Sequence, residues 1–294
     1  MVRELVVVSG KGGTGKTSII ASLVALASSD GLEFTLADCD VEASNLPLLL
    51  NSEIKNEEDF SGSKVASINP EKCTRCMICE ENCRFNAIKE FKVDELLCEG
   101  CGVCVHLCSA EAVKLKNRDS GRLYTSETGY GPLIYARLNP GETNSGKLVA
   151  LVRRKARQIT TKGGNQFIFS DGPPGIGCPV ISSITGANFA LLVAEPTVSG
   201  LHDFRRIFEL VRHFKEVKPM VAVNMWDVNP KVSVEISDFC SKEDLELVGK
   251  VSFDGTVAKA AANRKPVIEY APGCKASEEL RRLWDRVKSF TGLG

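Results

Sequence analysis

The feature of this sequence that most constrains its fold is a glycine-rich segment between an apolar stretch typical of a strand and another typical of a helix. The strand is predicted at residues 5–9 and the helix at residues 18–27. The segment between them reads Gly10, Lys11, Gly12, Gly13, Thr14, Gly15, Lys16 and Thr17. Glycine-rich turns that lead into a helix direct backbone N–H groups and the helix dipole at phosphate oxygens. The segment therefore predicts a phosphate-binding loop, in which Lys16 reaches the β- and γ-phosphates and Thr17 ligates Mg²⁺.

The rest of the chain alternates predicted strands with predicted helices. Strands are expected at residues 34–38, 167–170, 191–194, 220–224 and 247–251. Helices are expected at residues 200–214 and 232–240, shortly after Thr256, and at residues 277–290. This alternation is typical of an α/β fold with a mostly parallel sheet and helices on both faces. A chain of 294 residues is long enough for one such domain and a small companion.

Eight of the twelve cysteines form two equal runs. The pattern Cys-x2-Cys-x2-Cys-x3-Cys is made by Cys73, Cys76, Cys79 and Cys83, and it recurs 25 residues later in Cys98, Cys101, Cys104 and Cys108. Such runs are typical of [4Fe–4S] ligation, and the equal offset indicates a duplication. Zinc, which also takes four thiolates, is the alternative. A polar, acidic stretch at residues 51–62 precedes the runs, so we expect residues 67–116 to be an α+β domain inserted into an α/β domain of residues 1–66 and 117–294.

Charge and hydropathy exclude several functional classes. The 37 basic residues balance 37 acidic residues, so the chain has no overall positive field, and we expect no nucleic-acid partner. No apolar run approaches the roughly 20 residues that a membrane-spanning helix needs. The sequence opens without the features of a secretory leader, and we expect a cytoplasmic protein.

Two predicted strands end in acidic side chains of the type that nucleotide sites use. Asp38 and Asp40 close the strand at residues 34–38, and Asp171 follows the strand at residues 167–170. A carboxylate at such a strand end is suited to polarise water, a role that we assign to Asp40, whereas Asp38 is expected to support Mg²⁺ through water. The alternative is that these carboxylates only cap turns.

Because Lys11 is a second lysine inside the loop, the sequence resembles the deviant Walker ATPases, the family of MinD, ParA, nitrogenase iron protein and Mrp-type ATPases. The resemblance implies that Lys11 reaches across a dimer to the partner's nucleotide, and that Asp40 orients the attacking water. It also implies that Asp171 holds the Mg²⁺ shell and that the amide of Gly172 senses the γ-phosphate. Asn224 is expected to read the adenine edge, with a buried capping role as the alternative.

Residues 67–116 resemble two-cluster bacterial ferredoxins. The resemblance implies that one [4Fe–4S] cluster is bound by Cys73, Cys76, Cys79 and Cys108, and the other by Cys98, Cys101, Cys104 and Cys83. The sequence departs from that pattern at Arg84 and Ser109, where proline is usual. A positive charge at Arg84 is expected to favour reduction of one cluster and to make the two potentials unequal.

Over nearly its full length the chain resembles deviant Walker ATPases with such an insertion. The resemblance implies ATP or ADP, Mg²⁺ and two [4Fe–4S] clusters as cofactors, and a homodimer or related heterodimer through the nucleotide face. It also implies a redox or metal–sulfur protein partner, of the kind in the orange protein complex. The expected function is an ATPase, slow without its partner, that couples ATP to electron transfer or to metal–sulfur cluster handling. The alternatives are an Mrp-like cluster carrier and a MinD- or ParA-like positioning ATPase of cell division with redox-sensing clusters.

Four cysteines lie outside the runs. Nitrogenase iron protein carries a cluster ligand at the spacing of Cys178, but its second ligand has no counterpart here, so Cys178 is predicted to be a small buried residue. A metal shared by two Cys178 thiolates across a dimer is the alternative. Cys39, Cys240 and Cys274 are predicted to be structural.

Two charged helical segments have alternative interpretations. The basic run at residues 153–157 is expected on a helix with a solvated face, and a docking patch for an acidic redox partner is the alternative. The apolar stripe of the predicted C-terminal helix is expected to pack on the sheet, although MinD-type ATPases use such a helix to bind membranes.

Overall fold

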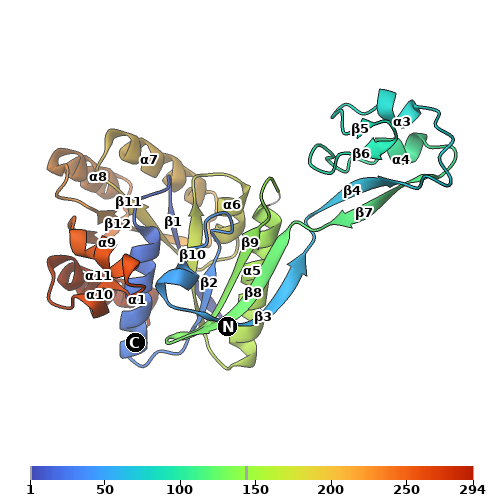
Figure 1. Cartoon of the computed structure of the whole chain (residues 1–294). Coiled ribbons are helices and arrows are strands. Elements are labelled where there is room, and N and C mark those ends of the chain that lie inside the picture. Colours follow the sequence, from blue (N-terminus) through green and yellow to red (C-terminus); the bar gives the residue numbers. More distant parts are fainter. Residues whose placement is uncertain (1, 143–144, 294) are drawn as a thin grey trace. The chain divides into compact units, whose positions relative to one another are not determined.

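The computed structural model describes residues 2–142 and 145–293, which form two compact units. Unit 1 comprises Met1–Glu57, Leu123–Arg137 and Ser145–Gly294, and unit 2 comprises Glu58–Arg122 and Leu138–Asn144. Figure 1 labels most elements of both units. In the described part of the chain, no helix combines the length and the apolarity needed to cross a membrane.

The main sheet has nine strands in the order β13-β12-β11-β1-β10-β2-β9-β8-β3. Its strands are β1 (Arg3–Ser9), β2 (Thr35–Asp38), β3 (Glu53–Phe60), β8 (Gly121–Thr128), β9 (Gly131–Leu138), β10 (Phe167–Pro174), β11 (Phe189–Ala194), β12 (Lys218–Asn224) and β13 (Glu246–Val251). Every pairing from β13 across to β9 is parallel. The mostly parallel sheet predicted from the alternation is therefore confirmed.

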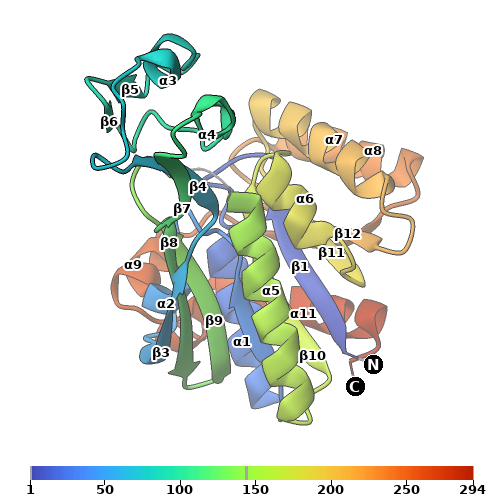
Figure 2. The ribbon, with the colours of Figure 1, turned by 90° about the vertical axis from the view of Figure 1, so that its right-hand side faces the viewer.

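Helices cover both faces of this sheet. They are α1 (Lys16–Ser29), α2 (Leu46–Leu49), α5 (Ser145–Lys162), α6 (Cys178–Ile184), α7 (Val198–Arg212), α8 (Pro230–Lys242), α9 (Gly255–Ala262), α10 (Val267–Tyr270) and α11 (Lys275–Thr291). Side chains of β1 alternate between two cores: Leu5 and Val7 pack with α1 and α11, while Val6 and Val8 pack with α6, α7 and α8. Figure 2 shows α5 and α6 in front of the sheet. Burial on both faces explains why residues 5–8 of β1 are apolar without interruption.

The C-terminal helix packs on the sheet, as expected. Leu280, Leu283, Trp284 and Val287 of α11 are all almost fully buried in the core that contains α1. The indole N–H of Trp284 donates a hydrogen bond to Asp30, 2.8 Å away, at the end of α1. The apolar stripe of α11 is therefore buried in the hydrophobic core.

The sequence interpretation missed the strands that extend the sheet beyond β2. Strand β9 pairs in parallel with β2, and β8 and β3 continue the sheet to its edge. Strand β3 is exposed at most positions and rich in Glu and Asp, so it lacks the apolar alternation by which a half-buried strand is recognised. The polar, acidic stretch at residues 51–62 thus contains an edge strand.

Unit 2 contains the two cysteine runs. Its antiparallel pair β4 (Ser63–Ile68) and β7 (Val113–Arg118) precedes and follows the runs. A second pair, β5 (Ile88–Lys89) and β6 (Lys92–Val93), lies between two short helices, α3 (Ile78–Glu81) and α4 (Val103–Leu107).

Candidate nucleotide site and cysteine centres

The glycine-rich loop joins β1 to α1 in unit 1. Gly15 is the N-cap of α1 with φ +85°, a left-handed conformation that favours glycine. A Cβ at this position would lie 2.3 Å from Nδ2 of Asn224. The amide of Asn224 donates a hydrogen bond of 2.9 Å to the carbonyl of Thr14. Asn224, predicted to read adenine or to cap a turn, thus supports the loop in the structure.

The two side chains predicted to hold Mg²⁺ most directly lie in contact. The hydroxyl of Thr17 donates a hydrogen bond of 2.6 Å to Oδ2 of Asp171, although the two residues are far apart in sequence. Oδ1 of Asp171 and the hydroxyl of Thr14 are buried without a hydrogen-bond partner in the described residues. Burial raises the pKa of Asp171 to about 6, opposed by the nearby charge of Lys16. An orphaned, buried carboxylate oxygen beside a hydroxyl fits a small divalent cation.

Asp38 is fully buried at the end of β2, and its carboxylate orders the following loop. It accepts hydrogen bonds from the hydroxyl of Ser44 (2.7 Å), the amide of Leu46 (3.1 Å) and the amide of Asp40 (3.0 Å). Burial and the neighbouring Asp171 raise the pKa of Asp38 well above its usual range. Asp38 therefore links the loop after β2 to the site around Asp171.

Asp40 lies two residues further on and is half-buried. Its carboxylate accepts a hydrogen bond of 3.2 Å from the amide of Ala43, so it caps a turn, the alternative role considered above. Burial raises the pKa of Asp40, while the charge of Lys16 opposes that shift. The carboxylate therefore lies within the field of the loop lysine, as a residue facing the phosphates would.

Gly172 follows Asp171 inside β10, where the chain passes close to β1. A Cβ at Gly172 would lie 2.6 Å from Cγ1 of Val8 and 2.7 Å from the carbonyl of Val7. Only glycine fits this approach without displacing β1. The β10 end that carries Asp171 is thus held against the strand that leads into the phosphate loop.

Lys11 makes contacts within its own chain. Its Nζ lies 2.5 Å from a carboxylate oxygen of Glu195, and it donates hydrogen bonds to the hydroxyls of Thr197 (3.3 Å) and Ser199 (3.1 Å). Glu195 follows β11 and its side chain is 11% exposed. Sequence reasoning assigned no role to Glu195. The signal available was an acidic residue directly after a buried strand of the same sheet.

In unit 2, four cysteines line each of two cavities. One cavity is bordered by Cys73, Cys76, Cys79 and Cys108. The other is bordered by Cys83, Cys98, Cys101 and Cys104. Each cavity thus receives three cysteines from one run and the last cysteine of the other. The structure brings together the two sets that the ferredoxin resemblance implied.

The backbone conformation of the first cysteine run recurs in the second run, 25 residues later. Residues with positive φ occur in matching pairs: Arg75 with Gly100, Met77 with Gly102, and Asn86 with Glu111. In each copy, an alanine amide donates to the last cysteine of the run, from Ala87 to Cys83 (3.4 Å) and from Ala112 to Cys108 (3.3 Å). The duplication seen in the sequence therefore extends to local conformation.

The thiols of each set influence one another. Burial is the main cause that raises the pKa of Cys79 and of Cys104, and the other thiols of the same run add to the increase. Among the described residues, no group of three or more His, Cys, Asp or Glu side chains lies close enough together to bind a metal ion as the structure stands. The structure therefore shows cavities lined by four thiols and no assembled metal centre.

The prediction for Cys178 is wrong, and the solvated face predicted for residues 153–157 fails at Arg153, whereas Arg154 and Arg157 are exposed. Cys178 is exposed, because the buried face of α6 is formed by Val180, Ser183 and Ile184, and the first residue of the helix lies off that face. Arg153 is not on a solvated face: it is 6% exposed and pairs with the buried Glu4. Cys39 and Cys240 are buried and Cys274 is partly buried, which agrees with structural roles.

Comparison with known proteins identifies relatives over nearly the whole chain. The family model "CobQ/CobB/MinD/ParA nucleotide binding domain" matches residues 5–267. The uncharacterized protein MJ0578 of Methanocaldococcus jannaschii is 33% identical over 290 residues, covering 99% of this chain and 98% of the relative. The septum site-determining protein MinD of Buchnera aphidicola is 25% identical over 282 residues, covering 91% of this chain and 84% of the relative.

A solved structure has the same fold. The septum site-determining protein MinD of Pyrococcus horikoshii, complexed with Mg-ADP, superimposes with a TM-score of 0.61 at 18% identity. The match covers 100% of this chain and 98% of that structure. At this identity the likeness concerns the fold.

Proposed function

Because this chain belongs to the CobQ/CobB/MinD/ParA nucleotide-binding domain family, we propose that it binds Mg·ATP at residues 10–17 and hydrolyses it to ADP and phosphate. The observation that carries this proposal is the contact between Thr17 and Asp171, 2.6 Å apart, at the start of α1. Oδ1 of Asp171 and the hydroxyl of Thr14 are buried and have no hydrogen-bond partner among the described residues. Such atoms are expected where a cation and phosphate oxygens bind.

Thr17 and Asp171 would hold Mg²⁺, with Asp38 acting through water. When bound, the ion neutralises charge on the β- and γ-phosphate oxygens. Lys16, which is 6% exposed, adds a fixed positive charge next to those oxygens. The loop therefore positions the nucleotide and stabilises the charge of the transferred phosphoryl group.

Asp40 would orient the attacking water. As water oxygen bonds to the γ-phosphorus and the bond from that phosphorus to the bridging oxygen breaks, the Asp40 carboxylate accepts a hydrogen bond or the proton from the water. Burial, which raises the pKa of Asp40, favours acceptance of a proton. ADP leaves with the electrons of the broken bond.

Lys11 would supply a second positive charge, to the nucleotide of a second subunit. Its side chain is 29% exposed, and its ammonium group lies against Glu195, Thr197 and Ser199. Two copies that exchange Lys11 would enclose two nucleotides, so we propose that hydrolysis requires a nucleotide-dependent dimer.

Unit 2 would hold two [4Fe–4S] clusters, one in each four-cysteine cavity. The donor chemistry fits, because each cavity offers four thiols and because backbone amides already donate to the sulfurs of Cys83, Cys98 and Cys108. When bound, such clusters supply one-electron transfer. We propose that the chain couples ATP turnover to electron transfer, or to metal–sulfur cluster handling, with a redox or metal–sulfur partner protein.

A positioning ATPase in cell division is the second candidate, favoured by the similarity to septum site-determining MinD proteins. In that case the cysteine sets would act as redox sensors. An Mrp-like cluster carrier is disfavoured, because eight thiol ligands from one chain suit permanently held clusters. Loss of clusters to an apo-ferredoxin acceptor would favour the carrier, and ATP-dependent binding to lipid vesicles would favour positioning.

Two pairs of variants test the proposal. Asp40→Asn is expected to reduce ATP hydrolysis at least 100-fold while ATP still binds, and the nearby exposed Glu42→Gln is the control. Cys108→Ala is expected to halve the iron and sulfide content after anaerobic reconstitution, with Cys240→Ala as the control. Unchanged hydrolysis in Asp40→Asn would contradict the assigned catalytic role. Unchanged iron in Cys108→Ala would contradict its role as a cluster ligand.

A further inference from the structure

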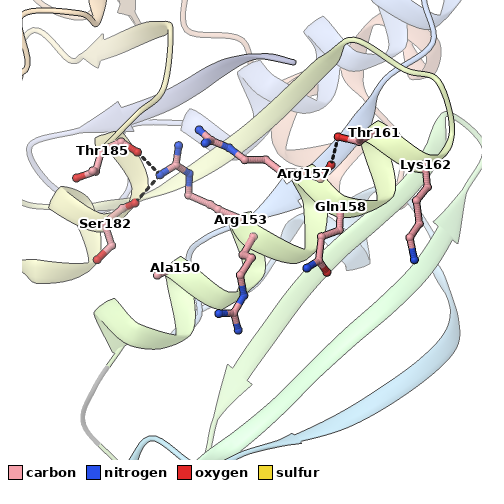
Figure 3. Close-up of a pocket in the computed structure, with 9 residues that line it drawn as sticks. Ala150, Arg153, Arg157, Gln158, Thr161, Lys162, Ser182 and Thr185 are labelled. Carbon is pink, nitrogen blue, oxygen red and sulfur yellow. Dashed lines mark hydrogen bonds between the residues drawn. The ribbon is translucent and has the colours of Figure 1, made fainter. Parts of the chain in front are cut away.

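A basic groove lies between α5 and α6, on the side of unit 1 opposite α1. Its volume is about 680 Å³, and Figure 3 shows the residues that line it. Four of them are cationic, and none of the described lining residues is acidic. The cations are Arg153, Arg154, Arg157 and Lys162 of α5. The groove therefore has the electrostatic character of a site for an anionic ligand.

The positive charge of the groove exceeds what the protein neutralises. One carboxylate, that of the buried Glu4, contacts both Arg153 (2.8 and 2.7 Å) and Arg157 (3.0 Å). Although burial acts to raise it, the pKa of Glu4 is lowered by hydrogen bonds and by the charges of these arginines. One negative charge thus faces two guanidinium groups. Arg154 and Lys162 are exposed and make no ion pair within residues 2–142 and 145–293, so they add two further uncompensated charges.

The arginines are fixed before any ligand arrives. Arg153 donates to the carbonyls of Ser182 (2.7 Å) and Thr185 (2.6 Å), which ties α5 to the end of α6, as Figure 3 shows. Arg157 donates to the carbonyl of Gly186 (2.5 Å) as well as to Glu4, yet its side chain remains 45% exposed. A guanidinium held in this way loses little conformational entropy when it binds an anion.

The length of the row of basic and polar side chains along α5 indicates which kind of anion fits the groove. Arg154, Arg157, Gln158 and Lys162 recur at the spacing of one helix face, over about 12 Å of α5. An extended peptide of about four residues covers that length, and arginine binds carboxylates through two parallel hydrogen bonds. A nucleic-acid backbone would require a longer basic surface, whereas the net charge of this chain is zero. We propose that the groove docks an acidic segment of a partner protein.

The position of the groove links docking to the nucleotide site. One wall is α6, which begins at Cys178 directly after the loop that follows Asp171. If that loop responds to the γ-phosphate, a step that rests on the proposed function, nucleotide exchange will change the affinity of the groove. Docking itself requires no nucleotide, so the two statements are tested separately.

The test uses the full-length protein and a fluorescein-labelled peptide of ten glutamates, with binding followed by fluorescence anisotropy. We expect saturable binding that weakens with salt, and a loss of at least tenfold in affinity for the Arg154→Glu/Lys162→Glu variant. The control is Lys231→Glu/Lys259→Glu, which makes the same change of charge at exposed positions of α8 and α9 and is expected to bind normally. Thermal melts verify that both variants fold.

Three results would overturn the docking proposal: no binding by the wild type, equal losses in both variants, or displacement of the peptide by an equal concentration of ten-nucleotide oligothymidylate. Repeating the titration with ADP and with a non-hydrolysable ATP analogue tests the coupling. Equal affinities in both states would remove the link to the nucleotide and leave the docking site in place.

Discussion

The ammonium group of Lys11 lies 2.5 Å from the carboxylate of Glu195 in the same chain. The proposed function requires Lys11 to leave this pair and reach the nucleotide of a second subunit. The ion pair would therefore oppose the proposed dimerisation, and Glu195 would determine how readily the lysine is released.

Removal of the Glu195 carboxylate should favour the ATP-bound dimer. A partly buried ion pair contributes about 1 kcal/mol, and the proposed dimer releases one such pair from each subunit, so Glu195→Gln is expected to lower the dissociation constant of that dimer about thirtyfold. Analytical ultracentrifugation with a non-hydrolysable ATP analogue measures the change. Ser199→Ala, which removes only one hydrogen bond to Lys11, is the control with a smaller effect. A weaker dimer in Glu195→Gln would show that the carboxylate assists assembly.

The buried Asp171 should make the nucleotide-free protein less stable as pH rises. Its pKa in the folded protein is about 6, above the ordinary value of 3.8, so the folded state binds the extra proton between these values. The resulting stabilisation is complete below about pH 4 and is lost as pH rises through 6, at a cost on the order of 3 kcal/mol. Asp171→Asn should therefore raise the melting temperature at pH 7.5 and have little effect at pH 4.

The same substitution should abolish the stabilisation by Mg·ATP, because it removes the proposed Mg²⁺ ligand. Differential scanning calorimetry at both pH values, with and without Mg·ATP, measures the two effects. A variant that is no more stable than the wild type at pH 7.5 would contradict the assignment of a raised pKa to Asp171.

The pair of Glu4 and Arg153 should be a major structural determinant. Glu4→Gln leaves the buried Arg153 without its counter-ion and should lower the free energy of unfolding by about 3 to 4 kcal/mol. Arg157→Gln, at a side chain that is 45% exposed, should cost less than about 1 kcal/mol. Because the pKa of Glu4 is lowered from 4.5, the wild type should lose this contribution as pH falls below about 4.5. Urea denaturation at pH 7 and pH 3.5 measures both differences.

Removal of a positive or a negative charge beside one cysteine cavity should shift the reduction potential of the cluster in that cavity in opposite directions. Arg84 and Glu99 both line the cavity of Cys83, Cys98, Cys101 and Cys104, whereas none of the described residues that line the other cavity is Asp, Glu, Lys or Arg. Arg84→Ala should lower the potential of the adjacent cluster, and Glu99→Gln should raise it, each on the order of 50 mV. Spectroelectrochemistry of the reconstituted protein measures both, and a shift of the same sign in the two variants would contradict an electrostatic cause.

The parallel sheet and the phosphate loop could be predicted because their signals are local. An apolar strand, a glycine-rich turn and an apolar helix follow one another directly, and the spacing of the cysteines repeats within 25 residues. Thr17, in the first turn of α1, lies near Asp171 of β10 because β1, which leads into α1, pairs in parallel with β10. The phosphate loop and the cysteine runs could be recognised without knowledge of distant contacts.

The remaining features depend on tertiary contacts that a single sequence does not display. The sequence alone places Arg153 in a solvated basic run, because its partner Glu4 is 149 positions away. The contact between Lys11 and Glu195 likewise joins the loop to the end of β11. Cys178 is exposed because helix α6 turns its other face to the core. In each case the partner, and so the role, was fixed by the fold.

The most direct test of the central claim is to measure the EPR spectrum and the oligomeric state of the anaerobically reduced protein, first with ADP and then with a non-hydrolysable ATP analogue. The account predicts cluster signals, a dimer with the ATP analogue only, and a change in those signals between the two nucleotide states. Cluster signals that are identical in both states, with no change in oligomeric state, would contradict coupling between the nucleotide site and the cysteine centres.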